Sequence, residues 1–226
     1  MVDEYMNEDD QAEVVKRWWR DNWLWVLSGI VLGLAGLTGW QYYQRYVAQR
    51  SEAAANTLNQ FAAALVTDTN KATALMNEMT TKYDATPYAP LAHLLQAQHA
   101  VEVEDLAGAE TALRAVMADN RDPELTQVAK LRLARVLIEQ GKQDEALTLL
   151  DVSKPSGFTA QMHEIRGDAL LSKQDQAGAI SEYQASLAAF QTDSSADVSL
   201  LQLKLADLGV STNSSQIQTA AEPSAK

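Results

Sequence analysis

Cysteine is absent from the 226 residues of this chain, and proline (five residues) and glycine (ten residues) are scarce. Without cysteine there is no disulfide framework, no thiol nucleophile and no thiolate metal ligand. Histidine is also rare: His93 and His99 lie six residues apart, which does not place them on one helix face, and His163 is distant. Metal sites usually have ligands at i and i+4 or in clusters. We therefore expect no metal site and no cofactor, and we interpret the histidines as solvated or half-buried helix residues.

Motifs of common enzymes are missing too, and the balance of charge disfavours nucleic-acid binding. There is no G-x-S-x-G, P-loop, G-x-G-x-x-G or H-E-x-x-H motif. The 30 acidic residues outnumber the 18 basic ones, so the net charge is −12, and residues 41–226 alone carry −8. An acidic domain repels nucleic acid and anionic lipid. The sequence therefore predicts a non-enzymatic protein that binds no DNA or RNA, with an enzyme that lacks a recognisable motif as the alternative.

One apolar run is unusually long, from Trp23 to Trp40 (WLWVLSGIVLGLAGLTGW). As a helix rising about 1.5 Å per residue it extends roughly 27 Å, close to the roughly 30 Å hydrocarbon core of a bilayer. Aromatic rings, which favour the membrane–water boundary, lie at both ends: Trp23, Trp25, Trp40, Tyr42 and Tyr43. A signal peptide has a shorter apolar region, usually about 7–15 residues, before a site of small residues. We predict an uncleaved transmembrane helix over residues 22–43; a cleaved signal or a buried helix of a soluble protein is the alternative.

The segment before this run, residues 1–21, is acidic at first and then basic and aromatic. Basic residues near the run number three before it and two after it, and they are Lys16, Arg17 and Arg20, then Arg45 and Arg50. This small excess favours a cytoplasmic N-terminus. The segment fits either a flexible tail or a short amphipathic helix on the membrane surface, whose apolar residues would be Val14, Val15, Trp18 and Trp19.

Small residues recur on one face of the predicted span, and they are Gly29, Gly33 and Gly36. Glycines at this spacing let another helix approach closely within a membrane, so they are candidates for a helix-packing face. Because glycine is common in transmembrane helices generally, its background frequency is the alternative explanation.

Helical periodicity continues after the span. Three segments have apolar residues at three- and four-residue intervals, and they are residues 45–66, 69–82 and 197–208. The first of them continues the span or restarts after it. Between these helices, three segments align from Leu91, Val128 and Gln161, at spacings of 37 and 33 residues. Each segment has a small residue, a second small residue twelve positions later, and a large apolar residue four positions after that. The three columns are Ala97, Ala134 and Gly167; Ala109, Ala146 and Ala179; and Leu113, Leu150 and Tyr183.

These columns predict two closely crossing antiparallel helices in each segment. Repeats near 34 residues with this arrangement resemble the tetratricopeptide class. We therefore predict an all-α fold, with a single N-terminal transmembrane helix followed by a tetratricopeptide-like helical-repeat domain over residues 44–208. An ordinary helical bundle with alanine at its contacts is the alternative. Residues 209–226 have few bulky apolar side chains and are expected to form a disordered tail.

Stacked helix pairs curve, and their first helices line a concave surface that suits a bound peptide or protein. The first small-residue column sets which side chains of each repeat should face that surface. They are Leu94, Gln98, Val101 and Glu102; Leu131, Arg135, Ile138 and Glu139; and Glu164, Asp168 and Leu171. Alternatively the fifth helix or the C-terminal helix fills the surface.

Several stretches of the sequence resemble one known family. They are EVVKRW at Glu13–Trp18, GLTGW at the end of the apolar run, and YAPLAHLLQAQ, LRLARVLIEQGKQDEAL and IRGDALLSKQDQAGA in the three repeats. The resemblance is to the YfgM family and covers roughly residues 3–208. The sequence departs from the family pattern at Gln174, where members often have glycine, and in the tail after Gly209.

The resemblance implies a location and partners that the residues alone do not predict. Members of this family are embedded in the lipid of the inner membrane of Gram-negative bacteria, with a cytoplasmic N-terminus and a periplasmic tetratricopeptide-like domain. They are ancillary subunits of the Sec translocon that associate with SecYEG and with the membrane-anchored periplasmic chaperone PpiD, and they assist exported client proteins. Regulation of envelope stress signalling, as a negative regulator of the Rcs response, is also attached to the family. A structural assembly protein of another envelope complex is the alternative.

Overall fold

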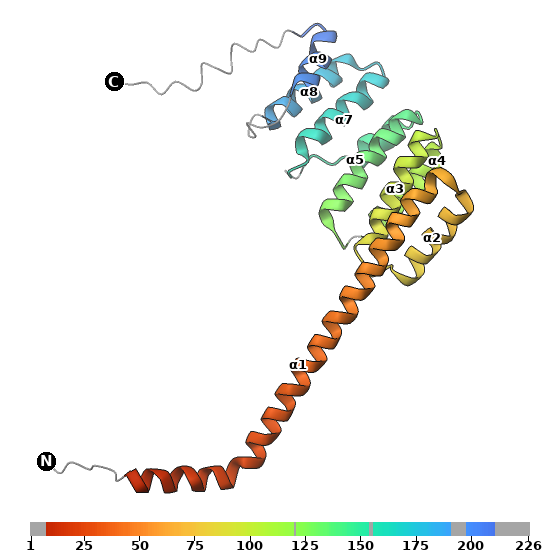
Figure 1. Cartoon of the computed structure of the whole chain (residues 1–226). Coiled ribbons are helices and arrows are strands. Elements are labelled where there is room, and N and C mark those ends of the chain that lie inside the picture. Colours follow the sequence, from red (N-terminus) through yellow and green to blue (C-terminus); the bar gives the residue numbers. More distant parts are fainter. Residues whose placement is uncertain (1–7, 120, 154–155, 191–197, 211–226) are drawn as a thin grey trace, which may run out of the picture. The chain divides into compact units, whose positions relative to one another are not determined.

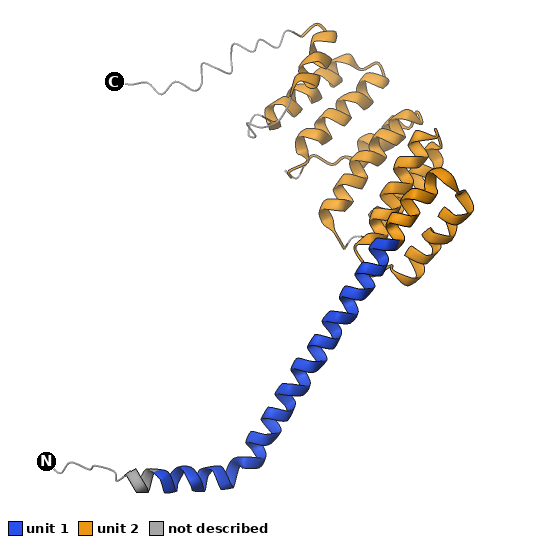
Figure 2. Ribbon diagram, in the orientation of Figure 1, with its two compact units in different colours: residues 1–56 blue, residues 57–226 orange. Residues whose placement is uncertain are grey.

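The computed structural model describes residues 8–119, 121–153, 156–190 and 198–210. These residues form helices and short connections, with no strand among them, which confirms the predicted all-α fold. The chain divides into two compact units, residues 1–56 and 57–226 (Figure 2). The tail expected over 209–226 lies outside the described residues, apart from Gly209 and Val210.

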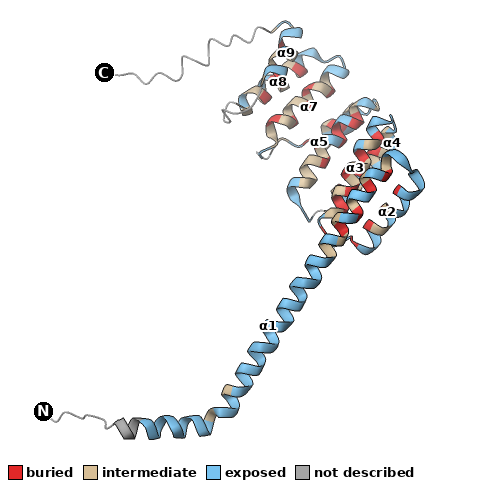
Figure 3. Cartoon of the chain, in the orientation of Figure 1, coloured by how far each residue is buried: buried red, intermediate tan, exposed pale blue. Residues whose placement is uncertain are grey.

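The first unit is built on α1 (Glu8–Thr67), which contains the predicted span. The apolar side chains of the span are uncovered: Trp25 is 79% exposed and Leu32 is 73% exposed, and Figure 3 shows nearly all of this part of the helix as exposed. The hydroxyls of Ser28 and Thr38 donate hydrogen bonds of 2.8 Å to carbonyl oxygens one turn earlier in the helix. A helix with an apolar surface and internally satisfied polar groups suits a hydrocarbon environment.

Within the described part of the chain, α1 is the one helix long and apolar enough to cross a membrane. It continues without interruption from Glu8 to Thr67, so the helix predicted over 45–66 continues the span and does not restart after it. Figure 1 shows that α1 changes direction near its N-terminal end.

The second unit is a stack of helix pairs that contains the three predicted repeats. The end of α1 precedes α2 (Thr69–Lys82), and the repeats are α3 (Tyr88–Glu102) with α4 (Leu106–Ala118), α5 (Pro123–Glu139) with α6 (Gln143–Leu149), and α7 (Thr159–Ser172) with α8 (Gln176–Phe190), before α9 (Ser199–Asp207). Helices that follow one another in sequence lie side by side along the stack (Figure 1). This arrangement buries the small-residue columns between helices.

Aspartate side chains define the start of several helices. Asp68, Asp105 and Asp122 each accept a hydrogen bond from a backbone N–H in the first turn, which satisfies donors that the helix leaves unpaired. Asp175 does the same for α8. At the equivalent position of the second repeat the residue is Lys142, whose side chain makes no such bond, and α6 is only seven residues long.

The repeat columns are buried as predicted. Every alanine, leucine and tyrosine in the three columns is exposed by 3% or less. The residues from Ala97 through Leu150 belong to one core that joins α3 to α7, whereas Ala179 and Tyr183 share a second core with Leu201 and Leu205 of α9. The close crossings therefore occur where the alignment of the sequence placed them.

Each repeat turns between its two helices through the same backbone conformation. Glu104, Gly141 and Gln174 occupy one position of the repeat and have positive φ angles of 62°, 77° and 65°. In each turn the N–H of the next residue donates to the carbonyl oxygen five residues before it, which closes the C-terminus of the first helix. α9 ends in the same way at Gly209, whose φ is 79°. The C-terminal helix thus ends as the first helix of a repeat does, a detail that its apolar periodicity did not predict.

Candidate functional site: a groove over the first two repeats

A groove of about 510 Å³ opens between α3 and α5, above α4. Its floor is apolar and consists of Ala97, Val101, Leu106, Leu113 and Val136. Its rim is polar and consists of Gln98, Glu102, Arg132, Arg135 and Glu139. A hydrophobic floor with a few polar groups around it is the usual composition of a ligand-binding surface.

The helical period explains why these side chains gather in the groove. On α3, Gln98, Val101 and Glu102 lie three and four residues apart and therefore share a face. On α5, Arg132 and Arg135 have the same relationship to each other, and Arg135 to Glu139. The floor is closed by α4. Its residues Leu106 and Leu113 lie two helical turns apart and both line the groove.

The rim has one wall with unpaired positive charge. Gln98 Nε2 donates a 3.0 Å hydrogen bond to Glu102 Oε1, so the α3 wall is internally bonded. Arg132 and Arg135 are exposed on the α5 wall, and within the described residues neither guanidinium has a carboxylate oxygen within 4.0 Å. In a domain with a strongly negative charge, two such arginines beside an apolar floor favour a partner with acidic and apolar side chains.

The structure brings five of the predicted groove residues together, and these are Gln98, Val101, Glu102, Arg135 and Glu139. The structure corrects the prediction for Leu94 and Leu131, which do not line this groove: each is 7% exposed and packed in the core between neighbouring helices. Ile138 is half-buried against the same core. Arg132 was missed, although its position three residues before Arg135 places it on the same face.

The third repeat does not continue the groove, because α9 covers part of α7. Lys204 Nζ donates hydrogen bonds of 2.8 Å to both Glu164 Oε1 and Asp168 Oδ1. Tyr183 donates a 2.7 Å hydrogen bond from its hydroxyl to Asp168 Oδ1. Glu164 and Asp168 are therefore bonded within the fold, which corrects their predicted role as open groove charges and agrees with the alternative of a C-terminal helix that fills the surface. Leu171 is 38% exposed, and its role stays a prediction.

Two groups of this part-buried cluster, Lys204 and Tyr183, have raised pKa values. Burial lowers the pKa of the Lys204 ammonium, but the hydrogen bonds to Asp168 and Glu164 outweigh it, so that the pKa lies above its ordinary value. Burial, followed by the bond to Asp168, raises the pKa of the Tyr183 hydroxyl. Both groups therefore keep their protons at neutral pH and hold α9 against α7 and α8.

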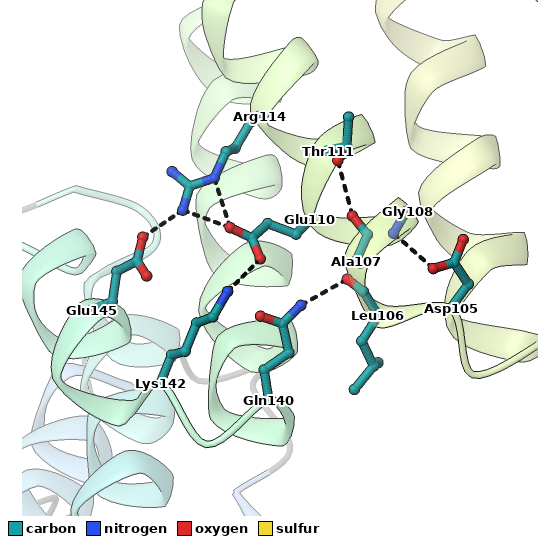
Figure 4. A network of polar contacts seen from close by, with 10 residues as sticks. All are labelled: Asp105, Leu106, Ala107, Gly108, Glu110, Thr111, Arg114, Gln140, Lys142 and Glu145. Atoms are coloured by element: carbon teal, nitrogen blue, oxygen red, sulfur yellow. Dashed lines mark hydrogen bonds and ion pairs between the residues drawn. The ribbon is translucent and has the colours of Figure 1, made fainter.

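A second polar network connects α4 with the end of α5 and with α6 (Figure 4). Glu110 of α4 accepts hydrogen bonds from Arg114 at 2.9 Å and from Lys142 at 2.9 Å, and Arg114 also bonds Glu145 of α6. Gln140 donates a 2.9 Å hydrogen bond to the carbonyl oxygen of Leu106, a floor residue. The bonds from Lys142 and then Arg114 lower the pKa of the Glu110 carboxyl to about 2. The network joins α4 of the first repeat to the second repeat.

The glycine face of the span belongs to the first unit and is unoccupied by other parts of the described chain. A β-carbon added at Gly29, Gly33 or Gly36 would meet nothing within 4 Å. The face is thus open to a partner helix, and its role in packing stays a prediction.

The residues that the structure describes include no cluster of three or more histidine, aspartate or glutamate side chains able to hold a metal ion. His163 instead bonds Glu182 at 2.6 Å, and Glu182 also accepts a 2.9 Å hydrogen bond from Arg166. Arg166 in turn donates to the carbonyl oxygens of Leu147 and Leu150 at the end of α6. These polar groups join α6, α7 and α8 and are explained by packing of the repeats.

Comparison with known proteins identifies a family and several relatives that match most of this chain. A family model described as a tetratricopeptide repeat-like domain matches residues 16–210. The chain is 33% identical to the ancillary SecYEG translocon subunit of Escherichia coli (strain K12) over 206 residues, which are 91% of this chain and 98% of that protein. It is 31% identical to the protein of the same name from Aggregatibacter actinomycetemcomitans, over 79% of this chain and 88% of that protein. The Haemophilus influenzae protein of this name is 27% identical over 90% and 98% of the two chains. No solved structure shows a significant match.

Proposed function

Since this chain belongs to the YfgM family, whose curated members are named ancillary SecYEG translocon subunits, we propose that it is a non-enzymatic, membrane-anchored adaptor of the Sec translocon. One observation carries the proposal: the same chain has an apolar helix without protein cover and a repeat unit with an open groove. The first feature anchors the protein in a membrane, and the second offers a surface for another protein.

The one apolar helix found among the described residues fits a single-pass inner-membrane protein. For its orientation we propose that residues 1–21 are cytoplasmic, that residues 22–43 cross the membrane and that residues 44–208 form a periplasmic domain. The excess of basic residues before the span supports this orientation. Protease added to spheroplasts should digest the repeat domain and spare the N-terminal segment, whereas a protected repeat domain would refute the topology.

Association with SecYEG is assigned to the span in this proposal. The open face of Gly29, Gly33 and Gly36 supports the assignment, because small residues allow close approach of another helix in the membrane. The exposed residues along this part of α1 are mainly apolar, which suits contact with another membrane helix and not with a soluble protein.

The groove is the proposed surface for partners outside the membrane. Its apolar floor suits a large apolar side chain, and Arg132 and Arg135 suit acidic residues beside that side chain. By the family resemblance, these partners are the membrane-anchored periplasmic chaperone PpiD and exported client proteins. The same resemblance supports a role in envelope stress signalling. In that role the groove would hold a signalling component in place of a client.

Native gel electrophoresis of detergent-solubilised membranes tests the adaptor function. The protein should migrate together with SecYEG, and should do so without any added substrate. Migration with an unrelated envelope complex, free of SecYEG, would favour the alternative of a structural assembly protein and would overturn the proposal.

A further inference from the structure

Residues 12–21 of α1 have two chemically different faces. Val14, Val15, Trp18 and Trp19 fall within an arc of roughly 140° when successive residues are separated by about 100°. Their side chains are 68%, 65%, 55% and 55% exposed, respectively, so no other part of the described chain covers them. Four large apolar side chains on one uncovered face, two of them tryptophan, are costly to leave in water.

The opposite arc of the same helix is charged. It contains Lys16, Arg17 and Arg20, together with Glu13 and Asp21. Each of these side chains is exposed. A helix with tryptophan and aliphatic residues on one side and lysine and arginine on the other is typical of segments that lie in the membrane interface.

The geometry of α1 permits this part of the helix to leave the direction of the span. Figure 1 shows that α1 bends near its N-terminal end, within the first unit. The apolar span follows immediately, from Trp23, so a bilayer that contains the span brings the amphipathic residues to its surface. Asn22, between the two parts, bonds its side-chain amide to the carbonyl oxygen of Trp18 at 2.9 Å, which leaves that amide satisfied at the junction.

We propose that residues 12–21 form an interfacial helix that binds the anionic phospholipid surface on the N-terminal side of the membrane, with Val14, Val15, Trp18 and Trp19 in the acyl region. Lys16, Arg17 and Arg20 lie at headgroup level, where basic side chains are attracted to anionic lipid. The occupant of the apolar face is lipid because the face is continuous with the lipid-spanning residues and its rim has the charge that complements anionic headgroups. The proposal depends on the span and not on association with SecYEG.

The absence of cysteine makes a direct test possible, because single cysteines can be introduced one at a time. The full-length protein is reconstituted in nanodiscs of phosphatidylethanolamine and phosphatidylglycerol, with no other protein present. The matched pair is Val14→Cys and Lys16→Cys, which lie about 160° apart around the helix, and Trp18→Cys with Arg17→Cys, one on the apolar arc and one on the charged arc, is a second pair. The measured quantity is the rate of reaction with a water-soluble maleimide.

In these nanodiscs the cysteines at 14 and 18 should react more slowly than those at 16 and 17, on the order of tenfold, because a thiol in apolar surroundings forms little thiolate. Nanodiscs of phosphatidylcholine alone should reduce this difference several-fold. Equal rates on both faces in the anionic nanodiscs would overturn the interfacial helix. Equal protection in both lipids would overturn the role of anionic headgroups. Protection that appears only after SecYEG is added would assign the apolar face to a protein and also overturn the proposal.

Discussion

A β-carbon on Gly167 of α7 would clash with Cε1 of Tyr183 on α8, so these helices cross where only a glycine fits. Tyr183 has no room to retreat, since its side chain is fully buried and its hydroxyl bonds Asp168. We expect Gly167→Ala to lower the free energy of unfolding by about 1–3 kcal/mol. The measurement is thermal unfolding of the full-length protein in detergent, in which the span stays helical and the cooperative transition reports the repeats.

Gly157→Ala is the matched control, because a β-carbon there would meet nothing within 4 Å. Its melting temperature should equal that of the wild type. If Gly167→Ala melts at the same temperature as this control, α7 and α8 do not cross as closely as the structure shows.

The alanine column should respond to added volume in the same way. Ala146 and Ala179 are fully buried at helix crossings, so replacement of either by leucine overpacks the contact, at about 1–3 kcal/mol. Ala107→Leu, at an exposed position of α4, provides the control with the same change in volume. Unchanged melting of Ala146→Leu and Ala179→Leu would show that the repeat alignment is wrong.

The repeat turns should be improved by glycine. Gln174 has a φ of 65°, a left-handed conformation that costs a residue with a β-carbon about 1–2 kcal/mol. Gln174→Gly should therefore raise the free energy of unfolding by about 1 kcal/mol, after the entropy cost of glycine in the unfolded chain is subtracted. Gly141→Ala, at the equivalent turn, should lower it. Denaturant titration of both variants measures the effect, and a Gln174→Gly variant less stable than the wild type would contradict it.

The network around Glu110 predicts a dependence of stability on pH. The pKa of Glu110 falls from 4.5 to about 2 in the fold, so its ionised form is stabilised by folding. That contribution is present above pH 4.5 and is lost as the pH falls toward 2. Glu110→Gln should thus be less stable than the wild type at pH 7, by about 0.5–1 kcal/mol for a partly exposed network. The difference should shrink in denaturant titrations between pH 4.5 and 2; a difference that stays constant over this range would exclude the network as its source.

The helices and their packing could be read from sequence because they depend on local patterns. The span follows from uninterrupted apolar residues, and the crossings follow from small residues such as Ala109 and Ala146 that recur at fixed spacing. Both signals are visible in the order of residues along the chain and do not require knowledge of which helix covers which. The same is true of the end of α2, which stops at Lys82, before Pro87.

The groove was only partly predictable, because its extent depends on which helix covers which. Leu94 and Leu131 share the helical face of groove residues, yet neighbouring helices bury them. Asp168 aligned with Arg135 as a charge of the concave surface, but Lys204 of α9 bonds it. No pattern within α7 indicates that a lysine 36 residues after Asp168 makes this bond. Charge reversal at Asp168 would therefore disturb the fold, and Arg132 with Arg135 is the better pair for probing the groove.

We propose that this chain binds the translocon through its span and a further protein through its groove. The most direct test is to quantify SecYEG that co-purifies with the full-length protein, for the wild type and two variants. We expect recovery with the wild type and with the groove variant Arg132→Glu/Arg135→Glu, which should lose its soluble-side partner instead. The glycine variant Gly29→Leu/Gly33→Leu should recover several-fold less SecYEG. Absence of SecYEG from the wild-type preparation would contradict the account.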